Sequence, residues 1–125
     1  MLGGADAAAT IPASDLERAK RFYNETLGLS LVKESKGGAV YASGNSKVFV
    51  YKTEFAGTNK ATTASWTVDN VESVASELTS KGIKLEHYDI PGVTRQGDVH
   101  ILGELKAIWF KDTEGNILSV ANGMG

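Results

Sequence analysis

The chain has no cysteine, only two histidines and almost no net charge. The lack of cysteine excludes disulfides, thiolate metal ligands and a cysteine nucleophile. It is typical of a reducing cytosol, so we expect a cytoplasmic location. A formal net charge of −2 offers no case for a basic surface that binds nucleic acid. No apolar run approaches the roughly 20 residues that cross a bilayer, which predicts that the protein has no membrane partner.

What the sequence does contain is one pattern that occurs twice. A short strand at residues 9–13 precedes an amphipathic helix that ends at Gly28, and a strand at residues 64–68 precedes a second helix that ends at Gly82. The two apolar stripes consist of Leu16, Ala19, Tyr23 and Leu27 and of Val71, Val74, Ala75 and Leu78. Two copies of one unit in 125 residues predict a duplicated module.

Polar residues predict where each helix begins. Ser14 and Glu17 have the S-x-x-E spacing of a capping box, and Asp69 and Glu72 repeat it in the D-x-x-E form. β-prone segments follow each helix, so each half is predicted to be a β-α-β-β-β module. The further strands are expected at residues 29–32, 39–42, 47–52, 83–88, 99–102, 105–110 and 117–121, with a long loop at 89–98. The chain is therefore expected to be one α+β domain over residues 1–125, with module one at 8–53, a linker at 54–62 and module two at 63–122.

Three segments resemble the vicinal-oxygen-chelate (VOC) superfamily, which includes glyoxalase I, bleomycin- and fosfomycin-resistance proteins, extradiol dioxygenases and methylmalonyl-CoA epimerase. They are residues 11–29 (IPASDLERAKRFYNETLGL), residues 68–72 (VDNVE) and residues 109–118 (WFKDTEGNIL), the last of which is similar to an F-x-D-P-x-G-N ending. The resemblance implies two paired modules whose sheets curl into an incomplete barrel around a groove. It also implies a homodimer, and in the enzymes a divalent metal ion in the groove.

The resemblance places the metal ligands at four positions, with histidine on the first strand and glutamate on the last strand of each module. Here these positions are Ala8, Thr63, Ser119 and one residue within 48–51. None carries an imidazole or a carboxylate, the donors that such a metal needs. The sequence therefore predicts that the metal site is absent, and no other cofactor is expected.

Strand alternation from these positions predicts which side chains line the groove. Small neutral residues and some aromatic walls favour a small organic ligand that is neutral or aromatic, and an arginine in the long loop is placed to clamp a carboxylate. The predicted ligand-binding residues are Thr10, Tyr41, Tyr51, Thr63, Ser65, Arg95, His100, Trp109 and Ser119, whereas Trp66 is predicted to face the helices.

Three functions stay open at this point. The first is a metal-free, bleomycin-resistance-like protein that sequesters or carries a small molecule in its groove. The second is an enzyme, a glyoxalase-like lyase or isomerase, an epimerase or a dioxygenase. It would use His100 and Glu104, which share one face if their strand is unbroken, and His87 is a weaker candidate. The third is a scaffold with a vestigial groove. The sequence leaves open whether the modules pair within one chain or between chains.

Overall fold

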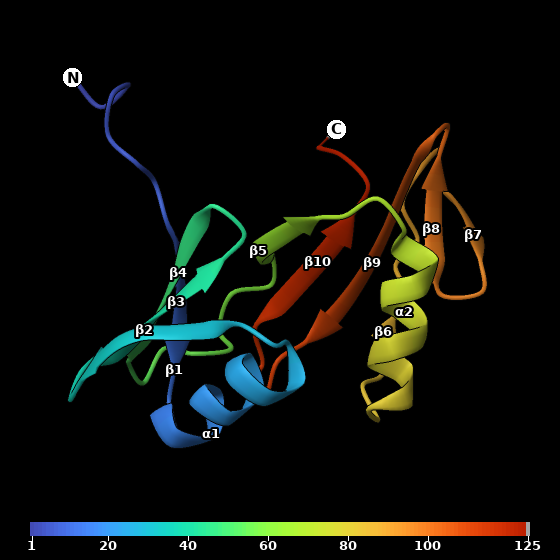
Figure 1. The fold of residues 1–125 in the computed structure, drawn as a ribbon. Coiled ribbons are helices and arrows are strands. Elements are labelled where there is room, and N and C mark those ends of the chain that lie inside the picture. The colour runs from blue at the N-terminus through green and yellow to red at the C-terminus, as the bar shows by residue number, and fades with distance from the viewer. Residues whose placement is uncertain (125) are drawn as a thin grey trace.

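The computed structural model describes residues 1–124, which form two modules that each begin with a strand and a helix (Figure 1). Module one contains β1 (Ala9–Ala13), α1 (Leu16–Arg21), a π-helix η1 (Phe22–Thr26), β2 (Ser30–Ser35), β3 (Gly38–Ser43) and β4 (Ser46–Lys52). Module two contains β5 (Thr62–Thr67), α2 (Val71–Ser80), β6 (Leu85–Glu86), β7 (Thr94–Gln96), β8 (Val99–Leu102), β9 (Leu105–Lys111) and β10 (Ile117–Ala121). The predicted α+β class is confirmed.

The strand order repeats between the two modules. The first sheet has the order β1-β4-β3-β2, and the second has the order β5-β10-β9-β8-β7. In both sheets the first strand of the module is parallel to the last, and the last is antiparallel to the strand before it. β6 pairs with β9 as well, so β6 and β8 together occupy the place that β2 has beside β3. The duplication seen in the sequence is therefore a duplication of sheet topology.

Two sequence predictions about local structure were wrong. The side chain that caps α1 is Asp15, which accepts from the Arg18 amide at 3.1 Å, and α2 is capped by Asn70 in the same way at 2.9 Å. Each cap lies one residue after the one predicted, and at α1 the Ser14 hydroxyl donates to Glu114 instead of capping the helix. The segment at 89–98 is not all loop, since β7 pairs with β8 along Thr94–Gln96.

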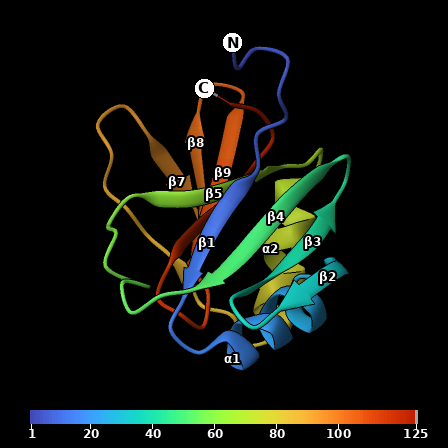
Figure 2. The same cartoon turned by 90° about the vertical axis from the view of Figure 1, so that its left-hand side faces the viewer.

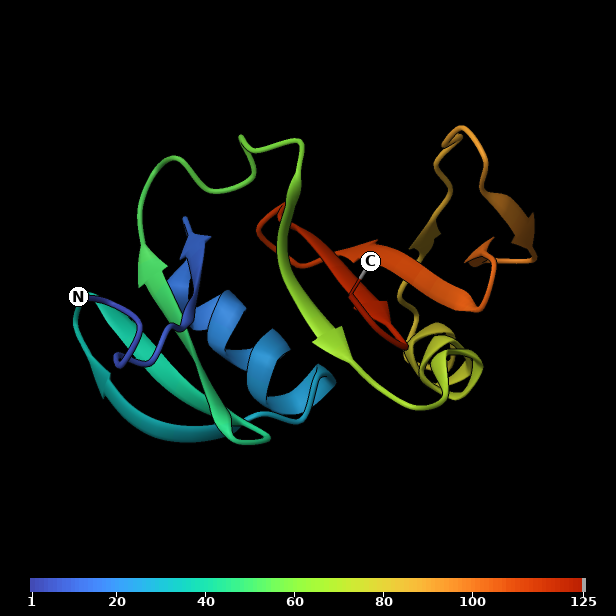
Figure 3. The ribbon, with the colours of Figure 1, turned by 90° about the horizontal axis from the view of Figure 1, so that it is seen from above.

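The two sheets do not close into a barrel within residues 1–124, which agrees with the predicted incomplete barrel. Viewed from above, α1 lies between the first sheet and the second (Figure 3), so the helix-covered face of the first sheet is turned toward module two. Leu29 and the end of η1 line a cavity of about 360 Å³ together with Trp66 and Phe110 of the second sheet. Trp66 thus lies on the helix side, as predicted, and its Nε1 donates to Ser43 Oγ at 2.9 Å. The helix-free face of the first sheet points outward (Figure 2).

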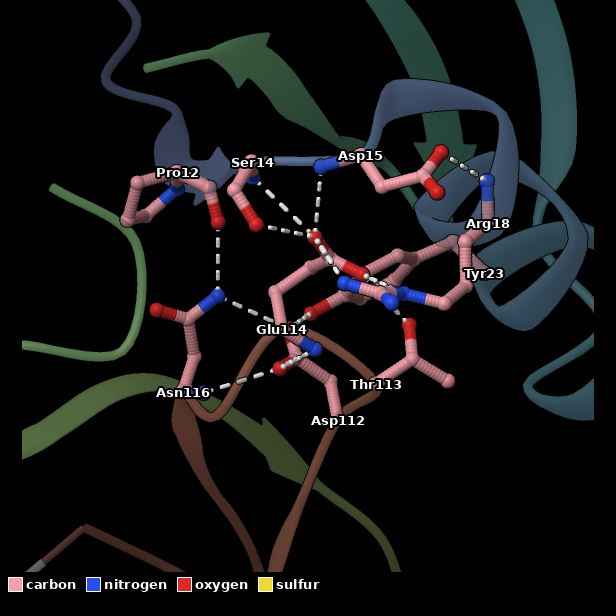
Figure 4. Close-up of polar contacts among 9 residues, drawn as sticks. All are labelled: Pro12, Ser14, Asp15, Arg18, Tyr23, Asp112, Thr113, Glu114 and Asn116. Carbon is pink, nitrogen blue, oxygen red and sulfur yellow. Dashed lines mark hydrogen bonds and ion pairs between the residues drawn. The ribbon is translucent and has the colours of Figure 1, made fainter. Parts of the chain in front are cut away.

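A buried polar network joins the β9–β10 turn to module one (Figure 4). Asp112 accepts from the Tyr23 hydroxyl at 2.6 Å and from the backbone amides of Glu114 and Asn116. Glu114 accepts from the amides of Ser14 and Asp15 and forms an ion pair with Arg18 at 2.8 Å. The contacts with Tyr23, Ser14, Asp15 and Arg18 join residues that are 89 to 100 positions apart in the sequence. They satisfy two buried carboxylates with several donors each, so this network holds the modules together.

None of the helices in the described part of the chain combines the length and the apolar character needed to cross a bilayer.

Candidate functional site

The helix-free face of the second sheet brings together most of the predicted site residues. Strand pairing sets Trp109 opposite Ser119, and Ser119 opposite Ser65. It sets Arg95 opposite His100, and His100 opposite Ala107, which shares its face of β9 with Trp109. We call this surface the Trp109 face, made up of Ser65, Glu86, Tyr88, Arg95, His100, Trp109 and Ser119. Residues from six strands or strand ends thus meet at one place.

Three rings form the centre of the Trp109 face. The centroids of the His100 and Trp109 rings are 4.8 Å apart in an edge-to-face arrangement. The Tyr88 ring packs edge-on against Trp109, with 5.5 Å between the centroids. Tyr88 and His100 are 6.2 Å apart, so the three rings contact one another. Trp109 and Tyr88 are both only partly buried, whereas His100 is 3% exposed. An aromatic surface that is open on one side can stack a planar molecule.

The backbone fixes the chemical state of His100. Its Nε2 accepts the backbone amide of Tyr88 at 2.9 Å, which leaves Nδ1 as the protonated nitrogen of a neutral ring. Burial lowers the pKa of His100 below its ordinary value, and the nearby Arg95 guanidinium acts in the same direction, whereas the backbone carbonyls of Ala107 and Asp98 beside the ring act against it. Near neutral pH the ring is therefore uncharged and offers one N–H donor.

Three buried polar atoms find no hydrogen-bond partner among residues 1–124: His100 Nδ1, Tyr88 Oη and Thr63 Oγ1. We call them the open polar atoms. Two of the three belong to the ring cluster on the Trp109 face. A buried polar atom without a partner costs about 1–3 kcal/mol, so such atoms are uncommon in folded proteins. Their concentration beside an exposed aromatic surface is typical of a place where a ligand supplies the missing partner.

Two of the predicted residues lie on a different surface, the helix-free face of the first sheet. Thr10 is paired with Phe49, and Pro12 with Tyr51. The rings of Phe49 and Tyr51 are stacked at 5.9 Å. We call this surface the Tyr51 face. Because it points outward, away from module two, Tyr51 and Trp109 do not line a common groove within one chain.

The predicted orientation of Tyr41 was wrong. Tyr41 is 1% exposed, and its hydroxyl approaches the Lys20 carbonyl of α1 at 3.4 Å. It pairs with the buried residue Val48, whereas Tyr51 pairs with Gly38. An odd separation along β4 places Val48 and Tyr51 on opposite faces, so Tyr41 belongs to the core under α1.

The structure also separates His100 from Glu104. β8 ends at Leu102, and Gly103 adopts a positive φ of 60° in the turn to β9. Glu104 therefore lies in an exposed turn, where its carbonyl accepts from Asn122, and His100 is buried on the sheet. The predicted acid–base pair is not assembled. His87, the weaker candidate, is exposed and contacts Asp98 at 2.7 Å.

Sequence reasoning missed several residues of these two faces. Tyr88, Glu86 and Phe49 were not assigned to a site, although Phe49 alternates with Tyr51 and so shares its face. Thr62 was placed in the linker, yet its Oγ1 accepts from Trp109 Nε1 at 3.1 Å. A register shift between Ile117 and Leu118 pairs Thr62 with Ile117 and makes Thr63 the extra residue. No sequence signal marks that bulge.

Comparison with known proteins assigns the chain to a family. The model of the Glyoxalase/Bleomycin resistance protein/Dioxygenase superfamily matches residues 7–120. The chain belongs to this superfamily. No curated protein sequence matches the chain. Among solved structures, a lactoylglutathione lyase from Agrobacterium tumefaciens is similar with a TM-score of 0.71 and 16% identity, covering 94% of this chain and 92% of that one.

Two further similar structures come from proteins connected with antibiotics. The fosfomycin resistance protein FosX from Mesorhizobium loti has a TM-score of 0.69 and 16% identity over 99% of this chain and 95% of that one. An antibiotic-binding protein from Streptomyces sp. CB03234 has a TM-score of 0.64 and 20% identity over 96% of each chain. At these identities the likeness shows a shared VOC fold.

The residues at the expected metal positions of this VOC chain do not fit a divalent ion. Ser119 faces Trp109, Thr63 lies in the bulge, and the helix-free positions of β4 carry Phe49 and Tyr51. Hydroxyl and aromatic groups replace imidazole and carboxylate. Across residues 1–124 there is no group of three or more histidine, aspartate or glutamate side chains placed to hold a metal.

Proposed function

We propose that this VOC protein binds a neutral or aromatic small organic molecule against the Trp109 face, without a metal ion, and thereby sequesters or carries it. The observation that supports this proposal is the cluster of Trp109, Tyr88 and His100, in which Tyr88 and His100 each carry one open polar atom. Aromatic walls with a few polar anchors are typical of small-molecule sites. Similarity to resistance and antibiotic-binding proteins also favours a bleomycin-resistance-like role over a structural one.

An enzymatic role has less support. General acid–base catalysis needs a proton donor or acceptor within reach of the substrate. Glu104 lies away from His100, and the His100 nitrogen that could act as a base already accepts a backbone amide. A glyoxalase-like, epimerase or dioxygenase reaction would thus need groups other than the pair that the sequence offered.

We also propose that the protein acts as a homodimer. Within one chain the Trp109 face and the Tyr51 face point in different directions, and neither is covered by the other module. Every residue of the edge strand β2 is exposed, including Leu31 at 46% and Val32 at 50%. Unpaired edges and open aromatic faces are commonly covered by a second copy. The Tyr51 face of a partner is chemically suited to close over the Trp109 face.

Fluorescence titration tests the binding proposal directly. The chain has two tryptophans, so Trp66→Phe leaves Trp109 as the only indole reporter. We expect bicyclic and tricyclic aromatic compounds to quench Trp109 and to raise the melting temperature of the parent protein. Trp109→Ala should abolish the melting shift, while Trp66→Phe should keep it. A panel without any shift in the parent protein would contradict the proposal.

Metal and oligomer measurements complete the test. Nickel, zinc, manganese or iron added to chelator-treated protein should leave the melting temperature unchanged, and light scattering should give twice the mass of the chain. Near-stoichiometric metal in the purified protein would contradict metal-free binding. A monomeric mass would contradict the dimer alone.

A further inference from the structure

The two open polar atoms of the ring cluster are both hydrogen-bond donors. The backbone amide of Tyr88 occupies His100 Nε2, so Nδ1 carries the proton and can only donate. The Tyr88 hydroxyl is the second open atom of the cluster and also has a proton to donate. The ring cluster therefore presents two donors. The cationic Arg95 is paired with His100, and Glu86, which forms an ion pair with Lys111, is paired with Trp109.

Resting on the proposed function, we propose that the ligand is a planar aromatic compound with a carbonyl oxygen attached to its ring, and that His100 Nδ1–H and the Tyr88 hydroxyl donate to that oxygen while Trp109 packs on the ring. A carbonyl oxygen has two lone pairs and can accept from both donors at once. A ligand that brought a donor of its own would leave His100 Nδ1 unsatisfied and would bind less well.

Tyr88 is the part of the cluster that can move to admit such a ligand. Both donor atoms are shielded from solvent, so the oxygen reaches them only if a ring turns aside. His100 is buried on β8, and Trp109 lies within β9, whereas Tyr88 follows the end of the two-residue strand β6 and is partly exposed. Its backbone stays anchored through the amide bond to His100 while its side chain rotates.

A matched pair of compounds tests the carbonyl requirement. 2-Acetylnaphthalene and 2-ethylnaphthalene have nearly the same shape, and only the first has an acceptor oxygen. Calorimetric titration of the full chain should show that the ketone binds about 3- to 10-fold more tightly than the hydrocarbon, which corresponds to one ordinary hydrogen bond. The Nδ1 signal of His100, followed by nitrogen NMR, should move with the ketone and not with the hydrocarbon.

Single-atom variants assign that preference to the cluster. Tyr88→Phe removes only an open hydroxyl, so it should reduce the preference for the ketone without lowering the melting temperature. Tyr41→Phe is the control, because it removes a tyrosine hydroxyl from the core under α1, away from the Trp109 face. It should leave the preference intact.

The possible outcomes separate this inference from the proposed function. If both compounds bind equally, or if Tyr88→Phe keeps the full preference and the His100 signal stays in place, the carbonyl inference is wrong while aromatic binding stands. If neither compound binds or shifts melting, both the inference and the proposed function are wrong. A preference lost in Tyr88→Phe and retained in Tyr41→Phe supports the inference.

Discussion

The Asp112–Glu114 network and the Trp109 face both contain buried polar groups and aromatic rings, but they differ in whether those polar groups have hydrogen-bond partners. In the network, Tyr23 and both carboxylates have partners. On the Trp109 face, the hydroxyl of Tyr88 and one nitrogen of His100 have none among residues 1–124. A complete set of partners within the chain indicates a structural role, whereas missing partners indicate a role toward another molecule.

The two regions also differ in charge. The network holds two carboxylates and a guanidinium, and the bonds that Glu114 receives from Arg18 and from backbone amides compensate for its burial. The ring cluster keeps a neutral histidine. Substitutions in the network should therefore change stability, and substitutions on the Trp109 face should change binding.

The largest expected effect comes from Asp112→Ala. This substitution removes the acceptor of the Tyr23 hydroxyl, of two backbone amides and of the Asn116 side chain, and it leaves those donors buried. We expect the free energy of unfolding, measured by urea denaturation, to fall by about 3–5 kcal/mol. Asp89→Ala, in an exposed segment, serves as the control and should change it by less than about 0.5 kcal/mol. Equal effects would show that the network is not structural.

Acid should reveal the second effect through Glu114. Burial alone would raise the pKa of Glu114, but the bonds from Arg18, the Asp15 amide and Thr113 lower it to about 2, against an ordinary value of 4.5. A carboxylate with a lowered folded-state pKa contributes stability above pH 4.5, and that stability is lost as the pH falls toward 2. Most of the roughly 3 kcal/mol that such a shift represents is lost by pH 3.

Comparing Glu114→Gln with the parent protein isolates this contribution. The unfolding free energy of the parent should fall by about 2 kcal/mol more than that of the variant between pH 7 and pH 3. Arg18 is itself 45% exposed, so solvent screens its part of the interaction and added salt should shrink the difference. If the unfolding free energies of the two proteins change with pH in parallel, Glu114 is not the cause of the loss of stability in acid.

Local patterns were enough to predict most of the fold. The helical stripes, the glycines at 28 and 82 and the β-prone segments depend on neighbours in sequence, and β1, β8 and β10 have the predicted bounds. The cap of α1 was missed by one residue because Ser14 and Asp15 are equally suitable locally. The Ser14 hydroxyl donates to Glu114, about a hundred residues away, and Asp15 caps the helix.

The site was harder to predict because it depends on register. The short turn between β3 and β4 pairs Tyr41 with Val48. Val48 and Tyr51 are an odd number of residues apart, so Tyr41 and Tyr51 lie on opposite faces of the sheet. The length of the turn was enough to predict this. Two other features could not be predicted from the sequence, because both arise from pairing between distant strands. They are the bulge that brings Thr62 to Trp109 and the contact between Tyr88 and His100.

Two tyrosine-to-phenylalanine substitutions test the comparison with the smallest chemical change, one hydroxyl in each region. The Tyr23 hydroxyl donates to Asp112 at 2.6 Å, and burial together with this carboxylate raises the pKa of Tyr23. Tyr23→Phe should therefore lower the unfolding free energy by about 1.5–3 kcal/mol, since the bond is to a charged acceptor. Tyr88→Phe removes a hydroxyl whose burial is uncompensated within residues 1–124, so stability should stay within about 0.5 kcal/mol or rise. If both variants lose the same stability, the Tyr88 hydroxyl has a partner within the protein, and the division between a structural and a binding region no longer holds.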